Sequence, residues 1–568
     1  MSARPALSSI LIKTIAVCSA TLGVLVTPVA APAQTVPADF AERVDSLLER
    51  SFEADGPGAM VVVTKDGEVI YRGARGMADV EGETPIRAET VFRYASITKQ
   101  FAAATMLKLA EQGRVSLDDP LSKYLPDFPA PGSDVTLAQL LNHTSGIKSY
   151  TNIPGWMTEE NTSRAYTTAE LIAEFADQPA DFEAGTAYSY NNSAYVLVGA
   201  VIEAVTGKPW YEAMVDEVTG AMGIPTITAF MDEASIANMA TGYTRGEDEK
   251  VTLAQKIHAS VPGAAGALRG TADDLIRWTE ALHAGDVLKA GSLKAMTTPT
   301  ALPQGKVENY GYGLGLNPLR GRSAIGHSGD IFGFATDVMH LPEERVSVAM
   351  LANSDTTSAP VSGLVARIAA LAIGDPFEEF TKVETDLASL EAYFGEYAIG
   401  ENDRRKFYAR DGKLYTLRSG NSESEVFAAQ GNRFFYGPGS LTWFEFGAED
   451  DGRPVMRMHQ NGAKEAELAT YAGPIEPVVA VTVPRTTLAS YAGTYATQYG
   501  KAVFTLGESD DLLLTFAGQP TTALIALDTD RFTAEGVDVT IIFAPVEGSM
   551  TMTLMQGGVT LEAERQAD

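Results

Sequence analysis

The spacing of apolar residues changes near residue 380, and this change divides the chain into two parts. In the first part, apolar residues recur at helical spacing in some segments and form short continuous runs in others. The segment "AMVVVTKDGEVIYRGARG" (59–76) predicts two strands joined by a tight turn, and "SVAMLANS" (347–354) predicts a buried strand. Helices are predicted after Ser96, at 137–143 and at 195–207. Because strands lie near both ends with helices between them, the pattern favours an antiparallel sheet backed by helices.

The second part has short, alternating segments rich in aromatic residues, with Gly and Asp at the turns, which is typical of all-β domains. It also contains a repeat. "LEAYFGEYAI" (390–399) returns as "LASYAGTYAT" (488–497), 98 positions later, and Leu414 maps to Leu512 at the same offset. Agreement of separate motifs at one offset indicates a duplication.

A length of 568 residues also favours several domains. We predict a multidomain α+β chain. An antiparallel sheet with flanking helices and a helical subdomain occupies residues 34–378. Two small β-barrel-like domains follow at 385–474 and 484–568, and a Pro-rich linker at 473–486 lies between them.

The N-terminus has the pattern of an export signal over residues 1–33. Arg4 and Lys13 precede an apolar run of 13 residues (14–26), and small residues follow it, with cleavage expected after Ala33. A membrane-spanning helix needs about 20 residues, so the run is too short for an anchor. We therefore expect a periplasmic or secreted protein.

The only cysteine, Cys18, lies inside this signal, and Val17 before it is too large for a lipoprotein signal. The mature chain would then have no disulfide and no thiolate nucleophile or metal ligand. The net charge of −30 disfavours nucleic acid and anionic membranes as partners, and on its own it indicates little more than solubility. No stable membrane insertion is expected.

Ser96 and Lys99 form the first candidate for chemistry. Three positions apart at a helix start, their side chains share one face. A serine hydroxyl becomes a good nucleophile when a base takes its proton, and a lysine with a lowered pKa can be that base. Ser145 and Lys148 match the same pattern, but Gly146 follows directly and no amphipathic helix does. Taken alone, the pattern describes a helix cap and a solvated lysine at least as well.

Tyr190 and Asn192 form a Tyr-x-Asn motif before an apolar helix. A tyrosine near an ammonium can ionise more easily and transfer a proton, and an asparagine amide can hold a substrate carbonyl or the lysine. Tyr150-Thr151-Asn152 has the same spacing, but it lies in a polar loop that no regular element follows.

The third motif is His327-Ser328-Gly329, at the start of a Gly-rich strand pattern. Glycine allows a strand to approach a ligand closely, and the amide of Asp330 could donate to an oxyanion together with the amide of Ser96. A strand-end histidine satisfied by backbone groups is the alternative interpretation. His143-Thr144-Ser145-Gly146 imitates this motif after a helix, so we interpret it as structural.

The six histidines are scattered and no His-x-x-x-His pair occurs, which makes a metal site a poor hypothesis. No phosphate-binding glycine loop is present either. We expect neither a metal nor an organic cofactor.

The three motifs in this order, over roughly residues 40–375, resemble the serine β-lactamase and penicillin-binding-protein family, in the branch similar to class C β-lactamases. The resemblance implies that Ser96 is the acylated nucleophile, that Lys99 and Tyr190 share the base and acid roles, and that Asn192 helps bind substrate. His327 stands where β-lactamases have a lysine. A histidine is mostly neutral near pH 7, which argues against an efficient β-lactamase.

Two β-domains after the catalytic domain resemble the D-aminopeptidase type of this family. The expected function is therefore acyl-enzyme hydrolysis of small peptides or amides, with a D-amino-acid-specific aminopeptidase as one form. A carboxylesterase or a weak β-lactamase at the same site is an alternative. A non-catalytic penicillin-recognising or cell-wall-binding protein is a third. The expected partner is a small-molecule or peptide substrate, and a homodimer stays open.

Overall fold

The structure is a computed structural model that describes residues 36–229, 232–246, 250–401, 403–437, 439–449, 452–497, 500–508, 511–516, 519–546 and 549–566. The predicted signal and its cleavage site lie outside these residues. Among the helices that are described, none is both long enough and apolar enough to cross a membrane.

A five-stranded antiparallel sheet forms the centre of the first part. Its order is β11(Ile325–Ile331), β12(Phe334–Leu341), β13(Val346–Ala352), β1(Ala59–Lys65) and β2(Glu68–Arg75). The continuous apolar run of β1 and the residues of β13 are buried because both strands are internal. Asp66 and Gly67 have positive φ angles of 56° and 81°, as the two-residue hairpin between β1 and β2 requires.

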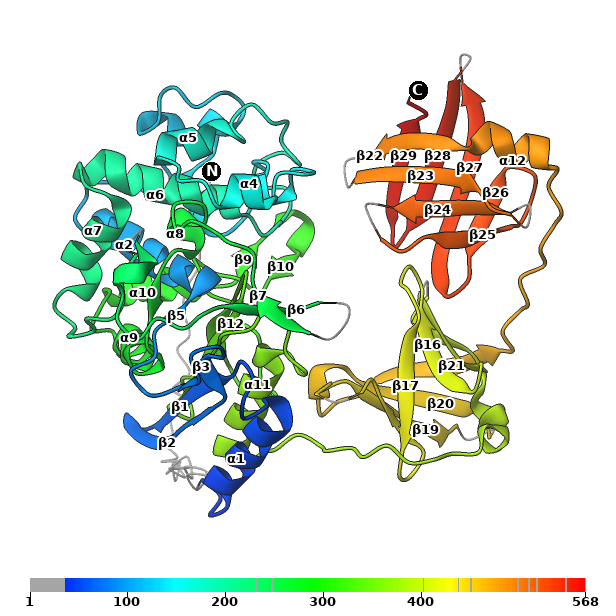
Figure 1. Cartoon of the computed structure of the whole chain (residues 1–568), viewed down its shortest axis with the longest axis horizontal. Helices are drawn as coiled ribbons and strands as arrows, with labels where there is room; N and C mark the ends of the chain where they lie inside the picture. The colour runs from blue at the N-terminus through cyan, green and yellow to red at the C-terminus, as the bar shows by residue number, and fades with distance from the viewer. Residues whose placement is uncertain are drawn as a thin grey trace, which may run out of the picture. The chain divides into compact units, whose positions relative to one another are not determined.

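Helices cover both faces of this sheet (Figure 1). On one face, α1(Phe40–Ser51) and α11(Val361–Ala372) share an apolar core with alternate residues of the strands. On the other face lie α2(Thr98–Glu111), α6(Asn192–Thr206) and α9(Ala272–Ala284). Nearly every residue of α2 is buried, which explains its Ala-rich, all-round apolar sequence.

Shorter elements complete this part. The helical ones are η1(Ala95–Ile97), η2(Leu121–Lys123), η3(Gly132–Asp134), α3(Leu137–Leu141), η4(Tyr150–Asn152), α4(Glu159–Thr162), α5(Thr168–Ala173), α7(Trp210–Met214), η5(Val215–Thr219), η6(Glu233–Ser235), α8(Gly263–Gly266), α10(Ala290–Met296) and η7(Pro303–Gly305). The short strands are β3(Met77–Asp79), β4(Thr84–Pro85), β5(Phe92–Arg93), β6(Tyr243–Arg245), β7(Val251–Leu253), β8(Arg269–Gly270), β9(Thr300–Ala301) and β10(Val307–Glu308).

Two eight-stranded antiparallel units follow, each with its own aromatic core. The first is a closed barrel of β14(Gly395–Ile399), β15(Asp403–Arg410), β16(Lys413–Arg418), β17(Ser424–Ala429), β18(Arg433–Phe435), β19(Trp443–Ala448), β20(Pro454–His459) and β21(Glu467–Gly473), with η8(Leu387–Tyr393) and η9(Gln460–Gly462). The second has α12(Arg485–Tyr491), β22(Gly493–Thr497), β23(Gly500–Leu506), β24(Leu512–Phe516), β25(Thr522–Ala526), β26(Arg531–Ala534), β27(Val537–Val546), β28(Ser549–Gln556) and β29(Val559–Glu564). The predicted fold class is confirmed.

The repeat seen in the sequence preserves one hydrogen bond in both units. In the first unit the hydroxyl of Tyr397 donates to the carbonyl oxygen of Tyr393 at 2.6 Å. In the second, the hydroxyl of Tyr495 donates to the carbonyl oxygen of Tyr491 at 3.0 Å. Tyr397 and Tyr495 are both fully buried and occupy matching places in the repeat. The two units are therefore related in their packing as well as in their sequence.

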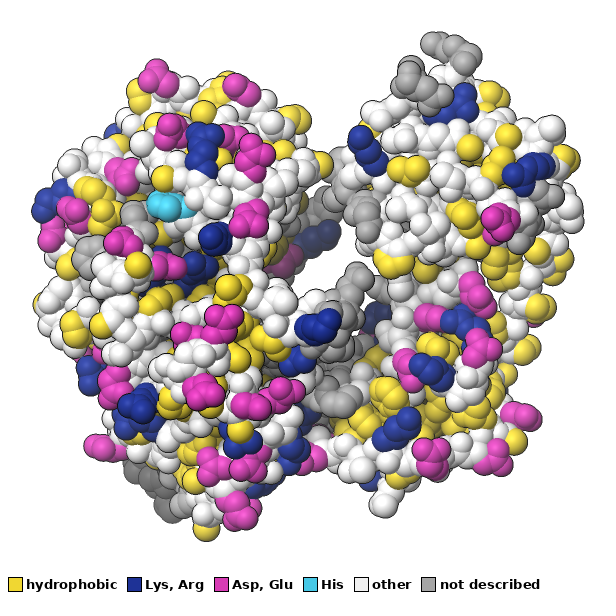
Figure 2. All heavy atoms as spheres, in the orientation of Figure 1, with side chains coloured by type: hydrophobic (Ala, Val, Ile, Leu, Met, Phe, Trp, Pro, Cys, Tyr) yellow, Lys and Arg dark blue, Asp and Glu magenta, His cyan; other side chains and the backbone are white. Residues whose placement is uncertain are grey.

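The acidic side chains are dispersed on the face of the molecule that Figure 2 shows. On the face seen in Figure 2, acidic side chains are interspersed with lysine and arginine. A distribution of this kind suits solubility, whereas binding of one charged polymer requires a concentrated patch.

Candidate active site

Ser96 lies in η1, directly before α2, and is half-buried. Its neighbour Ala95 has a φ of 50°, a left-handed conformation that costs an alanine about 1–2 kcal/mol. The turn is held from the other side, because the backbone N–H of Leu268 donates to the hydroxyl of Thr98 at 3.0 Å and the N–H of Tyr94 donates to the carbonyl of Leu268 at 2.8 Å. Strain held by its surroundings is a common feature of functional sites.

Lys99 is completely buried beside Ser96. Its Nζ lies 3.0 Å from Ser96 Oγ, 2.9 Å from Asn192 Oδ1 and 2.9 Å from the carbonyl oxygen of Ala265. None of these partners carries a negative charge, so burial lowers the pKa of the amine well below its ordinary 10.5. The geometry therefore places an amine with a reduced proton affinity in contact with a serine hydroxyl.

Tyr190 lies against the same pair of residues. The Lys99 Nζ is 4.7 Å from the centre of the Tyr190 ring, and the phenol hydrogen-bonds to Ser96. Burial raises the pKa of this phenol, and the bond to Ser96 only partly offsets the increase. This direction is opposite to the easier ionisation expected beside an ammonium, although 36% of the residue is exposed, and the catalytic role of Tyr190 stays a prediction. The arrangement favours a protonated phenol, which can donate a proton.

Asn192 is the first residue of α6, and the side chain of Asn191 caps this helix by accepting from the N–H of Ala194 at 2.9 Å. Besides accepting from Lys99, the Asn192 side chain donates through Nδ2 to the hydroxyl of Thr151 at 3.2 Å. These two partners fix the orientation of the amide. The loop 150–152, set aside in the sequence, thus supports the site through Thr151.

The edge strand β11 lies next to η1. A Cβ on Gly329 would lie 2.3 Å from the carbonyl oxygen of Tyr94 and 3.1 Å from the Cβ of Ala95. The hydroxyl of Thr336 lies 3.0 Å from that same carbonyl and 3.1 Å from the carbonyl of Gly329. Only glycine permits this approach, and Thr336 connects the two segments.

The backbone of β11 offers donors along its outer edge. Gly326 exchanges two hydrogen bonds with Gly315 on this edge, at 2.8 Å and 3.0 Å. Because backbone groups alternate along a strand, Ser328 and Asp330 direct their N–H groups to the same edge. The Asp330 amide is therefore oriented as the oxyanion hypothesis requires. The catalytic roles of this amide and of the Ser96 amide stay predictions.

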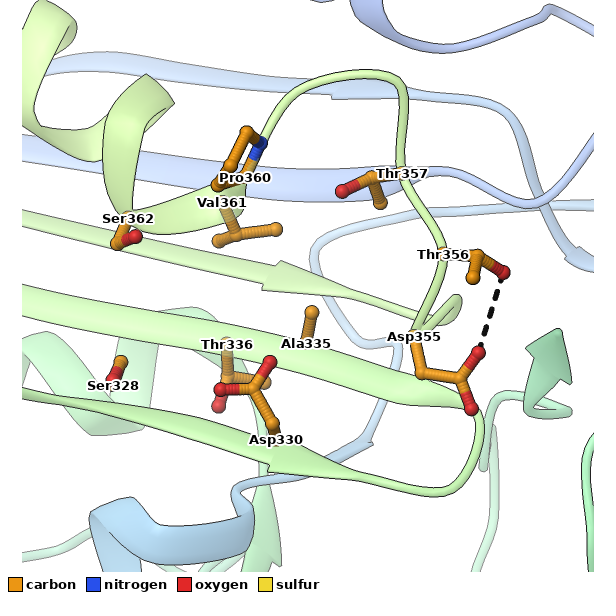
Figure 3. Close-up of a pocket in the computed structure, with 10 residues that line it drawn as sticks. All are labelled: Ser328, Asp330, Ala335, Thr336, Asp355, Thr356, Thr357, Pro360, Val361 and Ser362. Atoms are coloured by element: carbon orange, nitrogen blue, oxygen red, sulfur yellow. Dashed lines mark hydrogen bonds between the residues drawn. The ribbon is translucent and has the colours of Figure 1, made fainter. Parts of the chain in front are cut away.

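The side chains of Ser328 and Asp330 lie on the face of the sheet opposite the one on which Gly329 approaches η1. Together with Asp355 and the start of α11 they line a cavity of about 370 Å³, and Figure 3 shows both side chains directed into it. Burial, and secondarily Asp355, raises the pKa of Asp330. The side chains of Ser328 and Asp330 therefore point away from the face on which Gly329 approaches η1.

His327 points toward the aromatic residues of the site. Its Nδ1 lies 2.5 Å from the carbonyl oxygen of Ser328 and its Nε2 lies 2.9 Å from the hydroxyl of Tyr310. A carbonyl can only accept, so Nδ1 carries the proton and Nε2 accepts from the tyrosine. Burial and the nearby Lys99 lower the pKa of His327 to about 3. The ring is therefore neutral and does not offer a cation to a substrate carboxylate.

The sequence predicts only a structural role for His143. The structure places this histidine beside the candidate site. Its ring centre is 4.4 Å from that of Tyr190 and 4.8 Å from that of Tyr310. The N–H of Asn191 donates to His143 Nδ1 at 3.1 Å, whereas Nε2 is buried without a hydrogen-bond partner among the described residues. No local sequence pattern indicates this contact, which arises from the fold.

The second Ser-x-x-Lys match does not form a pair. Lys148 Nζ binds Asp181 Oδ1 at 2.9 Å, and Ser145 Oγ accepts from the N–H of Ile147 at 3.4 Å. Across the described ranges, no group of three or more His, Cys, Asp or Glu side chains is arranged to hold a metal ion.

Comparison with known proteins identifies the class. Residues 40–372 match the model of the Beta-lactamase family, so the chain belongs to this family and is a serine hydrolase related to β-lactamases. A penicillin-binding protein of Bacillus subtilis (strain 168) is 23% identical over 76% of this chain and 98% of its own length.

Two further similar proteins are named for hydrolysis of peptides or amides. A D-aminopeptidase of Gluconobacter oxydans (strain 621H) is 28% identical, and the match covers 57% of this chain but only 60% of that protein. The solved structure of a D-stereospecific amidohydrolase from Streptomyces sp. is 29% identical with a TM-score of 0.51, and the match covers 59% of this chain and 98% of that one.

Proposed function

We propose that this chain is an exported hydrolase that cleaves small peptides or amides containing D-amino acids through an acyl-enzyme on Ser96. The observation that carries the proposal is the buried Lys99 amine, 3.0 Å from Ser96 Oγ and bound only to uncharged partners. A catalytic base for serine needs this combination of contact and lowered pKa.

In the proposed reaction, Ser96 Oγ attacks the substrate carbonyl carbon while its proton passes to Lys99 Nζ. The amides of Ser96 and Asp330 stabilise the oxyanion. As the C–N bond breaks, the leaving amine takes a proton from the Tyr190 phenol, whose raised pKa keeps it protonated. Water then attacks the carbonyl carbon of the ester while the Tyr190 phenolate takes its proton. As the C–O bond to Ser96 breaks, the protonated Lys99 returns a proton to Ser96 Oγ, and the acid product leaves.

Two observations support the substrate class. The relatives named for D-aminopeptidase and D-stereospecific amidohydrolase activity act on amide bonds. The neutral His327 lacks the positive charge that would hold the carboxylate of a β-lactam. We therefore place amides above β-lactams as substrates, with esters as the chemically easier alternative.

Export rests on the segment 1–33 alone. The partner that we propose is a small-molecule or peptide substrate. The proposal leaves the oligomeric state open, with a homodimer as one form.

The test is covalent labelling. A fluorophosphonate probe should modify the wild-type chain at Ser96, as mapped by mass spectrometry, and Ser96→Ala should prevent labelling and abolish hydrolysis of D-alanine p-nitroanilide. Ser145→Ala is the matched control, because this serine belongs to the second Ser-x-x-Lys match and should label and turn over as wild type does. Labelling that survives Ser96→Ala would exclude this mechanism.

A further inference from the structure

A second pocket adjoins the catalytic residues beside α6. Its walls come from residues within 148–158, which include η4, from residues within 181–189, and from Gly500 of β23. Thr151 on this wall accepts from Asn192 Nδ2 at 3.2 Å, and Asn192 in turn accepts from Lys99 at 2.9 Å. Tyr188, on another wall, has its ring centre 5.9 Å from that of Tyr310. One side chain, Asn192 or Tyr310, therefore separates the pocket wall from Lys99 and from His327.

The pocket carries one ion pair. Of the described residues that line it, only Lys148 and Asp181 are charged, and Lys148 Nζ lies 2.9 Å from Asp181 Oδ1. Apolar side chains such as Ile153, Met157 and Phe182 share the remaining surface with polar ones such as Thr151 and Asn152. The Lys148 side chain is 17% exposed and that of Asp181 is 32% exposed. A partly buried charge interacts more strongly with a ligand than a charge in open solvent.

The ion pair is not required to hold the two loops together. The N–H of Asp181 donates to the carbonyl of Gly146 at 2.8 Å, and the N–H of Gly185 donates to the carbonyl of Thr144 at 2.7 Å. Gly146 also packs so closely that a Cβ there would lie 2.0 Å from the carbonyl oxygen of Phe182. Since partly exposed ion pairs add little to stability, a structural role gives a weak account of this pair.

We propose that Asp181 recognises an ammonium group on the acyl part of the substrate. This inference rests on the proposed function, because it assigns the substrate class of the same site. Asp181 Oδ1 is bound by Lys148, whereas Oδ2 has no partner among the described residues and can accept from a second cation. Lys148 is the more enclosed member of the pair, which makes it the poorer receptor for a charged ligand. The net charge of −30 also favours the approach of a cation.

The position of the pair selects the length of the acyl group. Three hydrogen bonds, from Ser96 through Lys99 and Asn192, separate the nucleophile from Thr151, and Lys148 lies further along the same loop. On this proposal, the intervening side chains place an ammonium at Asp181 beyond the residue that forms the ester. An extended residue spans about 3.3–3.6 Å, so the ammonium belongs to a preceding residue. The preferred acyl group is a dipeptidyl or longer chain with a free amino terminus.

The experiment compares three forms of glycyl-D-alanine p-nitroanilide, with the glycine amine free, acetylated or succinylated. The wild type should show its highest kcat/KM with the free amine. Asp181→Asn should lower kcat/KM for the free amine by roughly 10- to 100-fold, mainly through KM, because a hydrogen bond to a charged group is lost. It should leave the acetylated form unchanged. Asp216→Asn is the matched control, since Asp216 pairs with Lys208 and is 51% exposed outside this pocket.

Three outcomes would overturn the proposal. A preference for the succinylated form would make Lys148 the recognising residue. Equal turnover of all three forms would remove charge recognition altogether. An equal loss on all forms in Asp181→Asn would reduce Asp181 to a structural role. Continued cleavage of the acetylated form by Ser96 leaves the proposed function intact in each case. If turnover is too slow, calorimetry with glycyl-D-alaninamide and its acetyl form makes the same comparison, and equal binding overturns the proposal.

Discussion

Lys99 can accept a proton only in its neutral form, so its pKa determines where activity appears on the pH scale. Burial lowers this pKa well below 10.5, which moves the acidic limb of kcat/KM toward neutral pH. Activity should rise with pH through this limb. The raised pKa of Tyr190 keeps the phenol protonated beyond neutral pH, so a plateau should follow before any basic limb. Initial rates with D-alanine p-nitroanilide across pH 5 to 10 measure both limbs.

Lys99→Arg tests this assignment, because a guanidinium remains charged at every accessible pH. Turnover should fall by roughly 10²–10⁴-fold, the usual cost of losing a general base. Lys108→Arg on the same helix, where the lysine side chain is 28% exposed, should behave as wild type. A Lys99→Arg enzyme with normal kcat and an unshifted acidic limb would remove Lys99 from the base role.

From the buried Asp337 we predict a pH dependence of folding stability that is separate from catalysis. It is 6% exposed on β12, and burial, with a smaller effect from Asp330, raises its pKa from 3.8 to about 7. The unfolded chain loses this proton near pH 4, whereas the folded chain keeps it to about pH 7. Folding stability should therefore decrease as pH rises between these values. Asp337→Asn should gain roughly 2–3 kcal/mol more over wild type at pH 8 than at pH 5. Urea unfolding at both pH values measures this difference, and a constant difference would contradict it.

Sequence reasoning missed His143 and Thr151 for one physical reason. Ser96, Lys99 and Tyr190 lie in local patterns next to helices, so spacing is sufficient to select them. His143 and Thr151 contact the site only because loops distant in the sequence fold against α6. The direction of the Tyr190 pKa depends on desolvation and on the contact with Ser96, which are also properties of the tertiary structure.

At the scale of elements, the contact between β11 and η1 should control the oxyanion site. In Gly329→Ala, the new Cβ would lie 2.3 Å from the carbonyl oxygen of Tyr94, so the strand must move away from Ser96. We expect kcat to fall by roughly 10²–10³-fold, as for loss of an oxyanion donor, with a small change in KM. Gly291→Ala is the control, because a Cβ on this glycine would have no neighbouring atom within 4 Å. Normal kcat in Gly329→Ala would show that this contact does not set the site.

Elements are predicted well where one periodicity continues over many residues. The strands at 59–76 and the buried β13 follow from continuous apolar runs, whereas the predicted helix at 195–207 begins three residues after the true start of α6 because a polar first turn interrupts the pattern. The pairing of β11 with β12 and the order of the sheet depend on contacts between distant segments. Local pattern alone does not specify these contacts.

At the scale of the whole molecule, the duplicated units allow one change to be made twice. Tyr397→Phe and Tyr495→Phe each remove a buried hydroxyl and leave the carbonyl of Tyr393 or Tyr491 without its donor. Each should cost roughly 1–3 kcal/mol. The two bonds share no partner, so the double variant should lose the sum of the single losses to within about 0.5 kcal/mol. Calorimetry of the full chain measures these losses, and turnover at Ser96 should stay unchanged. A loss in one unit only would show that the repeated bond has kept its energetic role in just one of the two copies.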